Sequence, residues 1–103
     1  MTEWHRVASM DDVAPGSTLR VELDGAGICL CNVDGTIYAL RDNCSHKDFP
    51  LSEGELEGAR LECKWHGARF DVTTGRAVQL PAIKPVKTYE VRVEGKEILI
   101  AFG

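Results

Sequence analysis

Hydrophobic and polar residues alternate in short runs along the first part of the chain, and glycine-containing turns separate the runs. This alternation is typical of β-strands that bury one face, and no stretch repeats its apolar residues with the 3.6-residue period of a helix. We therefore expect strands at residues 4–8, 18–23, 28–33 and 36–41. Short strands joined by tight turns predict an antiparallel meander.

Turn residues set the limits of these strands. Ser9-Met10-Asp11-Asp12 resembles a capping box and predicts one helical turn, which Pro15-Gly16 ends. Residues 24–27, with the sequence Asp-Gly-Ala-Gly, separate the second strand from the third. Asp34-Gly35 predicts a hairpin turn because both positions accept a positive φ.

Residues 42–80 have shorter apolar runs and recurring glycines. We expect two small strand pairs there, each turning at a glycine: residues 56–57 with 59–62, and residues 68–72 with 77–80. Two clearer strands follow at residues 87–93 and 97–102, joined by a turn at Glu94-Gly95-Lys96. The prediction is one all-β domain over residues 1–103. Its antiparallel sandwich or barrel comes from about 1–41 and 81–103, and a loop-rich lobe from about 42–80.

Composition excludes several classes of protein. The 103 residues are 44% hydrophobic and carry a formal net charge of −4, with a pI near 5.3, which argues against binding nucleic acid. No apolar run approaches the length of a membrane span, and residues 1–10 lack the apolar stretch of a secretory signal. We therefore expect a cytoplasmic protein without a membrane partner.

Residues 44–66 hold two short pairs of metal-ligand side chains, and each pair contains one thiol and one imidazole. Cys44 and His46 form the first pair; Cys63 and His66 form the second, after a gap of sixteen residues. A structural zinc finger usually takes two like ligands from one loop. A [2Fe–2S] cluster with two Cys on one iron and two His on the other suits one of each from each loop. The pattern favours such a cluster, and structural zinc is the alternative.

This spacing resembles the Rieske iron–sulfur signature. The residues after His66 are similar to the H-G-x-x-F-D-x-x-T-G stretch of soluble Rieske ferredoxins: Gly67, Phe70, Asp71, Thr74 and Gly75. Lys47 stands where these ferredoxins often have Gly, and Lys64 where they often have Pro. The resemblance implies a Rieske-like fold whose loop-rich lobe binds one [2Fe–2S] cluster of the Cys2His2 type. Its ligands would be Cys44, His46, Cys63 and His66.

The remaining thiols and histidine have simpler interpretations. Cys29 and Cys31 lie two residues apart on one expected strand, so their side chains share a face and cannot easily form a disulfide. We expect both to be small buried core residues. His5 lies at the edge of the first strand, where we expect a solvated or hydrogen-bonded side chain. Lys47 and Lys64 either steer an acidic partner or are solvated loop charges.

The resemblance also implies a low reduction potential. High-potential Rieske proteins of respiratory complexes have an additional cysteine pair where this chain has Phe49 and Trp65. They also have Ser and Tyr hydroxyls, which stabilise the reduced state, where this chain has Ala68 and Phe70. We expect a potential of roughly −150 mV, at the low end of the Rieske range. Phe49 and Trp65 are candidates for an apolar cover over the cluster.

A group that only changes its oxidation state makes the protein a carrier and not an enzyme. A Rieske oxygenase also needs a mononuclear iron held by two His and one carboxylate, but only His5 remains once the cluster has its ligands. The resemblance implies a monomeric one-electron ferredoxin that takes electrons from a flavin-containing ferredoxin reductase. Its acceptor would be a terminal Rieske-type oxygenase for an aromatic compound. The alternatives are a small subunit of a larger redox enzyme, such as a nitrite reductase, and a zinc-stabilised interaction module.

Overall fold

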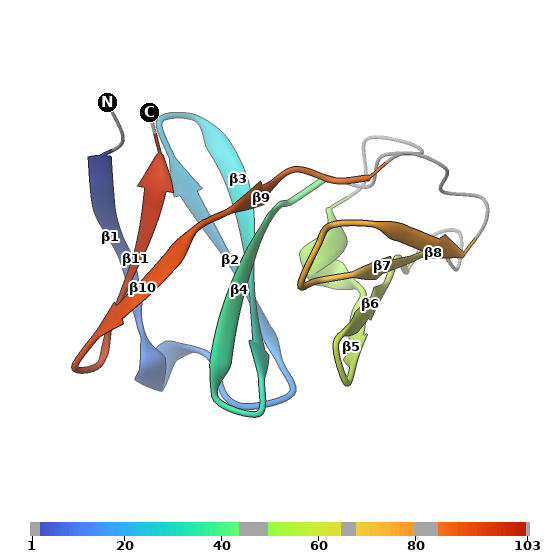
Figure 1. Ribbon diagram of the computed structural model, residues 1–103, viewed down its shortest axis with the longest axis horizontal. Helices are drawn as coiled ribbons and strands as arrows, with labels where there is room; N and C mark the ends of the chain where they lie inside the picture. Colours follow the sequence, from blue (N-terminus) through green and yellow to red (C-terminus); the bar gives the residue numbers. More distant parts are fainter. Residues whose placement is uncertain (1–2, 44–49, 65–67, 80–84, 103) are drawn as a thin grey trace.

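The computed structural model describes residues 3–43, 50–64, 68–79 and 85–102. Within them, short antiparallel strands form three sheets (Figure 1). Sheet A has the order β1 (Glu3–Ser9), β11 (Glu97–Phe102), β10 (Val91–Glu94). Sheet B has the order β2 (Thr18–Leu23), β3 (Ala26–Val33), β4 (Thr36–Arg41), β9 (Thr88–Tyr89). Sheet C has the order β5 (Glu55–Glu57), β6 (Arg60–Glu62), β7 (Arg69–Asp71), β8 (Ala77–Gln79).

The N-terminal strands and their turns agree with the sequence analysis. Ser9 caps the 3-10 turn η1 (Met10–Asp12): its backbone N–H donates to Asp12 at 2.9 Å, and its hydroxyl accepts from the N–H of Asp11 at 3.3 Å. The predicted capping box is therefore confirmed. Asp34 and Gly35 both have a positive φ, 51° and 91°, as the predicted hairpin requires.

Two boundaries differ from the prediction, each for a local reason. Asp24 and Gly25 also both have a positive φ, so they complete a two-residue turn and pairing already resumes between Leu23 and Ala26. The strand expected at residues 87–93 is interrupted at Glu90. Before that residue β9 pairs with β4 in sheet B, and after it β10 pairs with β11 in sheet A. The hydrogen-bonding partner changes although the side-chain alternation continues, and the chain thereby links the two sheets.

Strand β3 separates two hydrophobic cores because its successive side chains point to opposite faces. Ile28 and Leu30 belong to the inner core, which joins sheets A and B and contains these buried residues: Ala8, Val13, Ile28, Leu30, Ile37, Ala39, Ile98 and Ile100. Cys29 and Cys31 belong to the interface core, which joins sheet B to sheet C and the segments around it. Its buried residues are Cys29, Cys31, Leu40, Leu51, Leu61, Cys63, Ala68, Phe70, Val72 and Val86.

Sheet C and the 3-10 turn η2 (Leu51–Glu53) lie beside the sandwich of sheets A and B (Figure 1). Gly58, with a φ of 60°, turns β5 into β6, and the β7–β8 hairpin turns at Gly75, with a φ of 79°. Both predicted strand pairs of this lobe are therefore confirmed. No helix in the described part of the chain is long and apolar enough to cross a membrane.

Candidate functional site

Cys63 directly follows β6 and is completely buried in the interface core. Its backbone N–H donates a hydrogen bond to the carbonyl oxygen of Ala68 at 2.6 Å, which continues the pairing of β6 with β7 by one step. Cys63 and Ala68 are therefore the last paired residues at this end of the β6–β7 hairpin. In the sequence, His66 lies between them.

The other three proposed ligands, Cys44, His46 and His66, lie outside the described residues, as do Lys47, Phe49 and Trp65. In the described ranges there is no group of three or more His, Cys, Asp or Glu side chains that would hold a metal. The described residues nevertheless define both ends of each stretch that carries the proposed ligands. The contacts of these flanking residues show where each stretch is attached to the rest of the fold.

Asp42 joins the two ends of the first stretch. It follows β4 and precedes Cys44 by two residues, and its side chain has no exposed surface. One carboxylate oxygen, Oδ1, accepts from the backbone N–H of Ser52 at 2.7 Å, and the other, Oδ2, accepts from the Ser52 hydroxyl at 2.6 Å. Residues 42 and 52 are thus joined directly across the stretch that contains Cys44 and His46.

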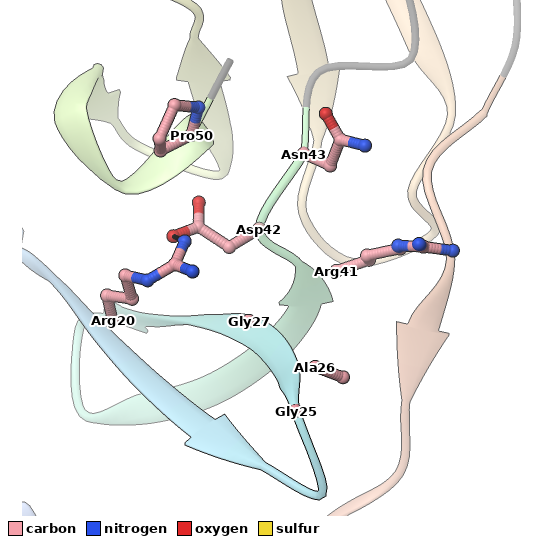
Figure 2. Close-up of a pocket in the computed structure, with 8 residues that line it drawn as sticks. All are labelled: Arg20, Gly25, Ala26, Gly27, Arg41, Asp42, Asn43 and Pro50. Atoms are coloured by element: carbon pink, nitrogen blue, oxygen red, sulfur yellow. Dashed lines mark hydrogen bonds and ion pairs between the residues drawn. The ribbon is translucent and has the colours of Figure 1, made fainter. Parts of the chain in front are cut away.

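Arg20 of β2 supplies the countercharge for this buried carboxylate. Its Nη1 lies 2.7 Å from Oδ2 of Asp42, and Figure 2 shows the guanidinium directed at the carboxylate. This hydrogen bond raises the pKa of Arg20, so the guanidinium stays charged. Gly27 on β3 makes room for the guanidinium, because a Cβ there would lie 2.6 Å from Nη2 of Arg20.

The second stretch has an ion pair beside its base. Glu62 and Arg69 are cross-strand partners in β6 and β7, one step before Cys63 and Ala68. Arg69 contacts one carboxylate oxygen of Glu62 with Nε at 2.9 Å and with Nη2 at 2.8 Å. Both side chains are partly exposed, whereas the Asp42 carboxylate is buried, so we expect this pair to be worth less than that of Arg20 and Asp42.

Residues 70–75, which carried part of the family resemblance, have structural roles. Phe70 is fully buried in the interface core. Asp71 accepts from the hydroxyl of Thr73 at 2.6 Å and from its N–H at 2.9 Å, and these bonds lower the pKa of the Asp71 carboxyl. The carbonyl of Gly75 accepts from the N–H of Val86 at 2.8 Å, which fixes the chain after residues 80–84 against the β7–β8 turn.

Cys29 and Cys31 are completely buried, as predicted, and their sulfur atoms lie 3.8 Å apart. The hydrogen bond with Cys31, together with burial, raises the pKa of the Cys29 thiol. A metal ligand has to be a thiolate, so this environment suits a core residue and not a ligand.

The residues present fit a [2Fe–2S] cluster. Cys63 is a thiol at the base of a hairpin, among apolar side chains that exclude water, and this protects a metal–sulfur group. The sequence analysis missed the buried network of Arg20, Asp42 and Ser52. The available signal was the position of Asp42 two residues before a proposed ligand, but its partners come from distant positions in the sequence.

Comparison with known proteins agrees with this assignment. The family model for the Rieske [2Fe-2S] domain matches residues 3–90. The ferredoxin component of biphenyl 2,3-dioxygenase from Rhodococcus jostii (strain RHA1) is 45% identical over 95 residues, which cover 92% of this chain and 89% of that protein. The ferredoxin component of the naphthalene 1,2-dioxygenase system from Pseudomonas aeruginosa is 40% identical over 101 residues, which cover 97% of each protein.

Solved structures show the same fold. The ferredoxin of carbazole 1,9a-dioxygenase from Nocardioides aromaticivorans IC177 superposes with a TM-score of 0.91 at 36% identity, covering 95% of this chain and 96% of that chain. A chain from a complex of reduced oxygenase and oxidised ferredoxin in carbazole 1,9a-dioxygenase gives a TM-score of 0.90 at 36% identity. That match covers 95% of this chain and 92% of the other. Since the matched ferredoxins are electron-transfer components and the match spans nearly the whole chain, this protein belongs to the Rieske [2Fe–2S] family and is an electron carrier.

Proposed function

We propose that this chain takes single electrons from a flavin-containing reductase and delivers them to a Rieske-type oxygenase that acts on an aromatic compound. The observation that carries the proposal is the nearly end-to-end match to ferredoxin components of biphenyl and naphthalene dioxygenase systems. The similarity to a chain from a complex of oxygenase and ferredoxin supports the acceptor. A carrier has to release its partner after each electron, so we expect a small and weak contact with each protein.

We propose Cys44, His46, Cys63 and His66 as the ligands, with one thiolate and one neutral imidazole from each stretch. Buried Cys63 and the joined ends of the first stretch support this set, and the protonated core position of Cys29 argues against its inclusion. A cluster held by these residues would supply one-electron redox chemistry. The chain would supply the thiolates and imidazoles and keeps water from Cys63.

The low potential inferred from the sequence, roughly −150 mV, is part of the proposal. Ala68 and Phe70 are both completely buried and belong to the same core as Cys63. Neither side chain can donate a hydrogen bond to sulfur, so the reduced state lacks that stabilisation. We further propose a cytoplasmic monomer, since thiols stay reduced in that compartment. Its cluster-binding lobe would span about residues 42–80.

Anaerobic reconstitution tests the proposal. The purified protein should be red-brown and contain two iron and two sulfide per chain. In stopped-flow mixing, an NADH-dependent flavin reductase from a biphenyl dioxygenase system should reduce it, and the oxygenase component should reoxidise it. Nitrogen coupling in the EPR spectrum of the reduced protein would support the histidine ligands. A colourless zinc protein would refute the proposed cluster. A reduced protein that no such oxygenase oxidises would refute the proposed acceptor.

A further inference from the structure

We propose that Asp42 is a positioning residue for the cluster: its buried carboxylate holds together the two ends of the stretch that carries Cys44 and His46, and fixes them on sheet B. This inference rests on the proposed ligand set. It assigns a role to a network that does not itself contain a ligand.

The first argument is the chemistry of the carboxylate. Its side chain is fully inaccessible to solvent, and the carboxylate accepts from three donors at 2.6–2.7 Å: Arg20 Nη1, the Ser52 hydroxyl and the Ser52 N–H. Burying a carboxylate costs desolvation that its attraction to the partly exposed Arg20 scarcely offsets, so the network is weak evidence for added stability. A buried charged network instead fixes geometry, because each of its bonds has a preferred direction.

The second argument is where these bonds lead. The N–H of Asp42 donates to the carbonyl of Gly27 on β3 at 2.9 Å, and the carbonyl of Ser52 accepts from the hydroxyl of Thr18 on β2 at 3.1 Å. Both ends of the stretch are therefore attached to sheet B as well as to each other. Arg20 reaches the same carboxylate from β2 (Figure 2). Through its side chain and its backbone N–H, Asp42 connects the end of β4 with η2, β2 and β3.

The third argument links the two ligand stretches. Leu51 lies next to Ser52 and is completely buried in the interface core, the same core that contains Cys63. Holding Ser52 in place therefore also fixes the packing of Leu51 in the core around the second stretch. A loop whose two ends are already joined loses less conformational entropy when it closes around a group. Release of Asp42 should loosen the first pair of ligands relative to Cys63.

A merely structural role makes a different prediction. If the network only added stability, its loss would lower the unfolding temperature and leave the folded protein's cluster unchanged. If it positions ligands, its loss should alter the cluster at temperatures far below unfolding. Outer-shell partners that orient metal ligands typically change metal retention about 10–100-fold when they are removed.

The test uses the holoprotein with Asp42→Ala, Asp42→Asn and Ser52→Ala. Ile100→Val, in the inner core away from this network, is the matched control for lost stability. We expect the iron chelator ferrozine to remove iron from Asp42→Ala at 25 °C about tenfold faster than from the wild type. Its EPR lines in the reduced state should be broadened or shifted. Asp42→Asn and Ser52→Ala, which keep some of the bonds, should be intermediate, and Ile100→Val should keep the wild-type spectrum and rate.

Two results would overturn the inference. One is a set of network variants that lose iron at the wild-type rate and keep its EPR spectrum. The other is an Ile100→Val control whose iron-loss rate and EPR spectrum change as much as those of the network variants. If Asp42→Ala does not fold, the Ser52→Ala comparison decides in the same way. A wild-type protein without iron and sulfide, or without nitrogen coupling, would instead refute the proposed ligand set, and that failure is visible before any variant is made.

Discussion

The N–H of Cys63 and the carbonyl of Ala68 are hydrogen-bonded at 2.6 Å, and the side chains of both residues are completely buried in the interface core. The pair closes the hairpin that carries the C-x-x-H sequence. Residue 68 is therefore adjacent to a proposed ligand in space as well as near it in sequence, so its side chain is well placed to influence the potential.

Introducing hydroxyl groups at this hairpin should raise the reduction potential. Ala68→Ser and Phe70→Tyr each introduce a donor that favours the more negative, reduced state. A preference of about 1 kcal/mol for that state corresponds to about 40 mV for one electron. Spectroelectrochemical titration measures the shift. Ala39→Ser, which places a hydroxyl in the inner core, is the control and should leave the potential unchanged.

Buried thiols should differ sharply in their importance for the cluster. Cys63→Ser should abolish a stable cluster. Cys29→Ala should retain two irons per chain, although it leaves a small cavity that costs roughly 1 kcal/mol of stability. Iron analysis and visible absorption of the two variants give the comparison. Loss of the cluster from Cys29→Ala, with Cys63→Ser intact, would reverse the ligand assignment.

The reduction potential should depend on pH if imidazoles bind the cluster. Reduction adds negative charge and raises the pKa values of the ligand imidazoles. The potential should be constant at low pH and fall as pH rises above the pKa values of the oxidised state, by at most about 59 mV per unit for each proton taken up. Protein-film voltammetry across the pH range measures this. His5→Gln should preserve the profile, because His5 lies on β1 and outside the proposed ligand set.

Gly75→Ala should destabilise the protein more than Gly95→Ala. Both glycines have a positive φ, 79° and 64°, which costs an alanine about 1–2 kcal/mol. A Cβ on Gly75 would also clash with the carbonyl oxygen of Val86, whereas Gly95 has open space around it. Urea unfolding should therefore show a further loss of at least about 1 kcal/mol for Gly75→Ala. Equal losses would mean that the contact with Val86 is unimportant.

Gly27→Ala tests Arg20 without altering a hydrogen-bonding group. The new methyl would displace the guanidinium from Asp42, since it would lie 2.6 Å from Nη2. Arg20 is partly exposed and remains attracted, so we expect a loss of about 1–2 kcal/mol, below the roughly 3–5 kcal/mol of deleting one partner of a buried pair. Urea unfolding measures this loss. Arg20→Gln should produce a larger loss than Gly27→Ala, and a Gly27→Ala protein of wild-type stability would contradict the expectation.

The strands of the sandwich were predictable because their side-chain alternation and turn residues are local. Asp34-Gly35 ends β3 and starts β4 through its own backbone preference, and Cys29 with Cys31 shares a face through the period of a strand alone. The interruption at Glu90 was not predictable, since the alternation continues there and only the partner strand changes.

The candidate site was predictable to a similar degree. Cys63 could be proposed as a ligand from its spacing to His66, and its burial agrees with strand alternation, since Leu61 two residues earlier is also buried. The network around Asp42 could not, because its partners Arg20 and Ser52 lie 22 and 10 residues away along the chain. Only the fold brings these three side chains together.

The composition of the inner core has a consequence for how the cell makes this protein. Among the described residues, its buried members come from residues 8–39 and from β11, and none comes from the described parts of the lobe, residues 50–64 and 68–79. The lobe is synthesised before β11, the strand that completes the sandwich by pairing with β1. We therefore expect the sandwich to close without help from the lobe, so that the protein can fold in the cell before iron and sulfide are delivered.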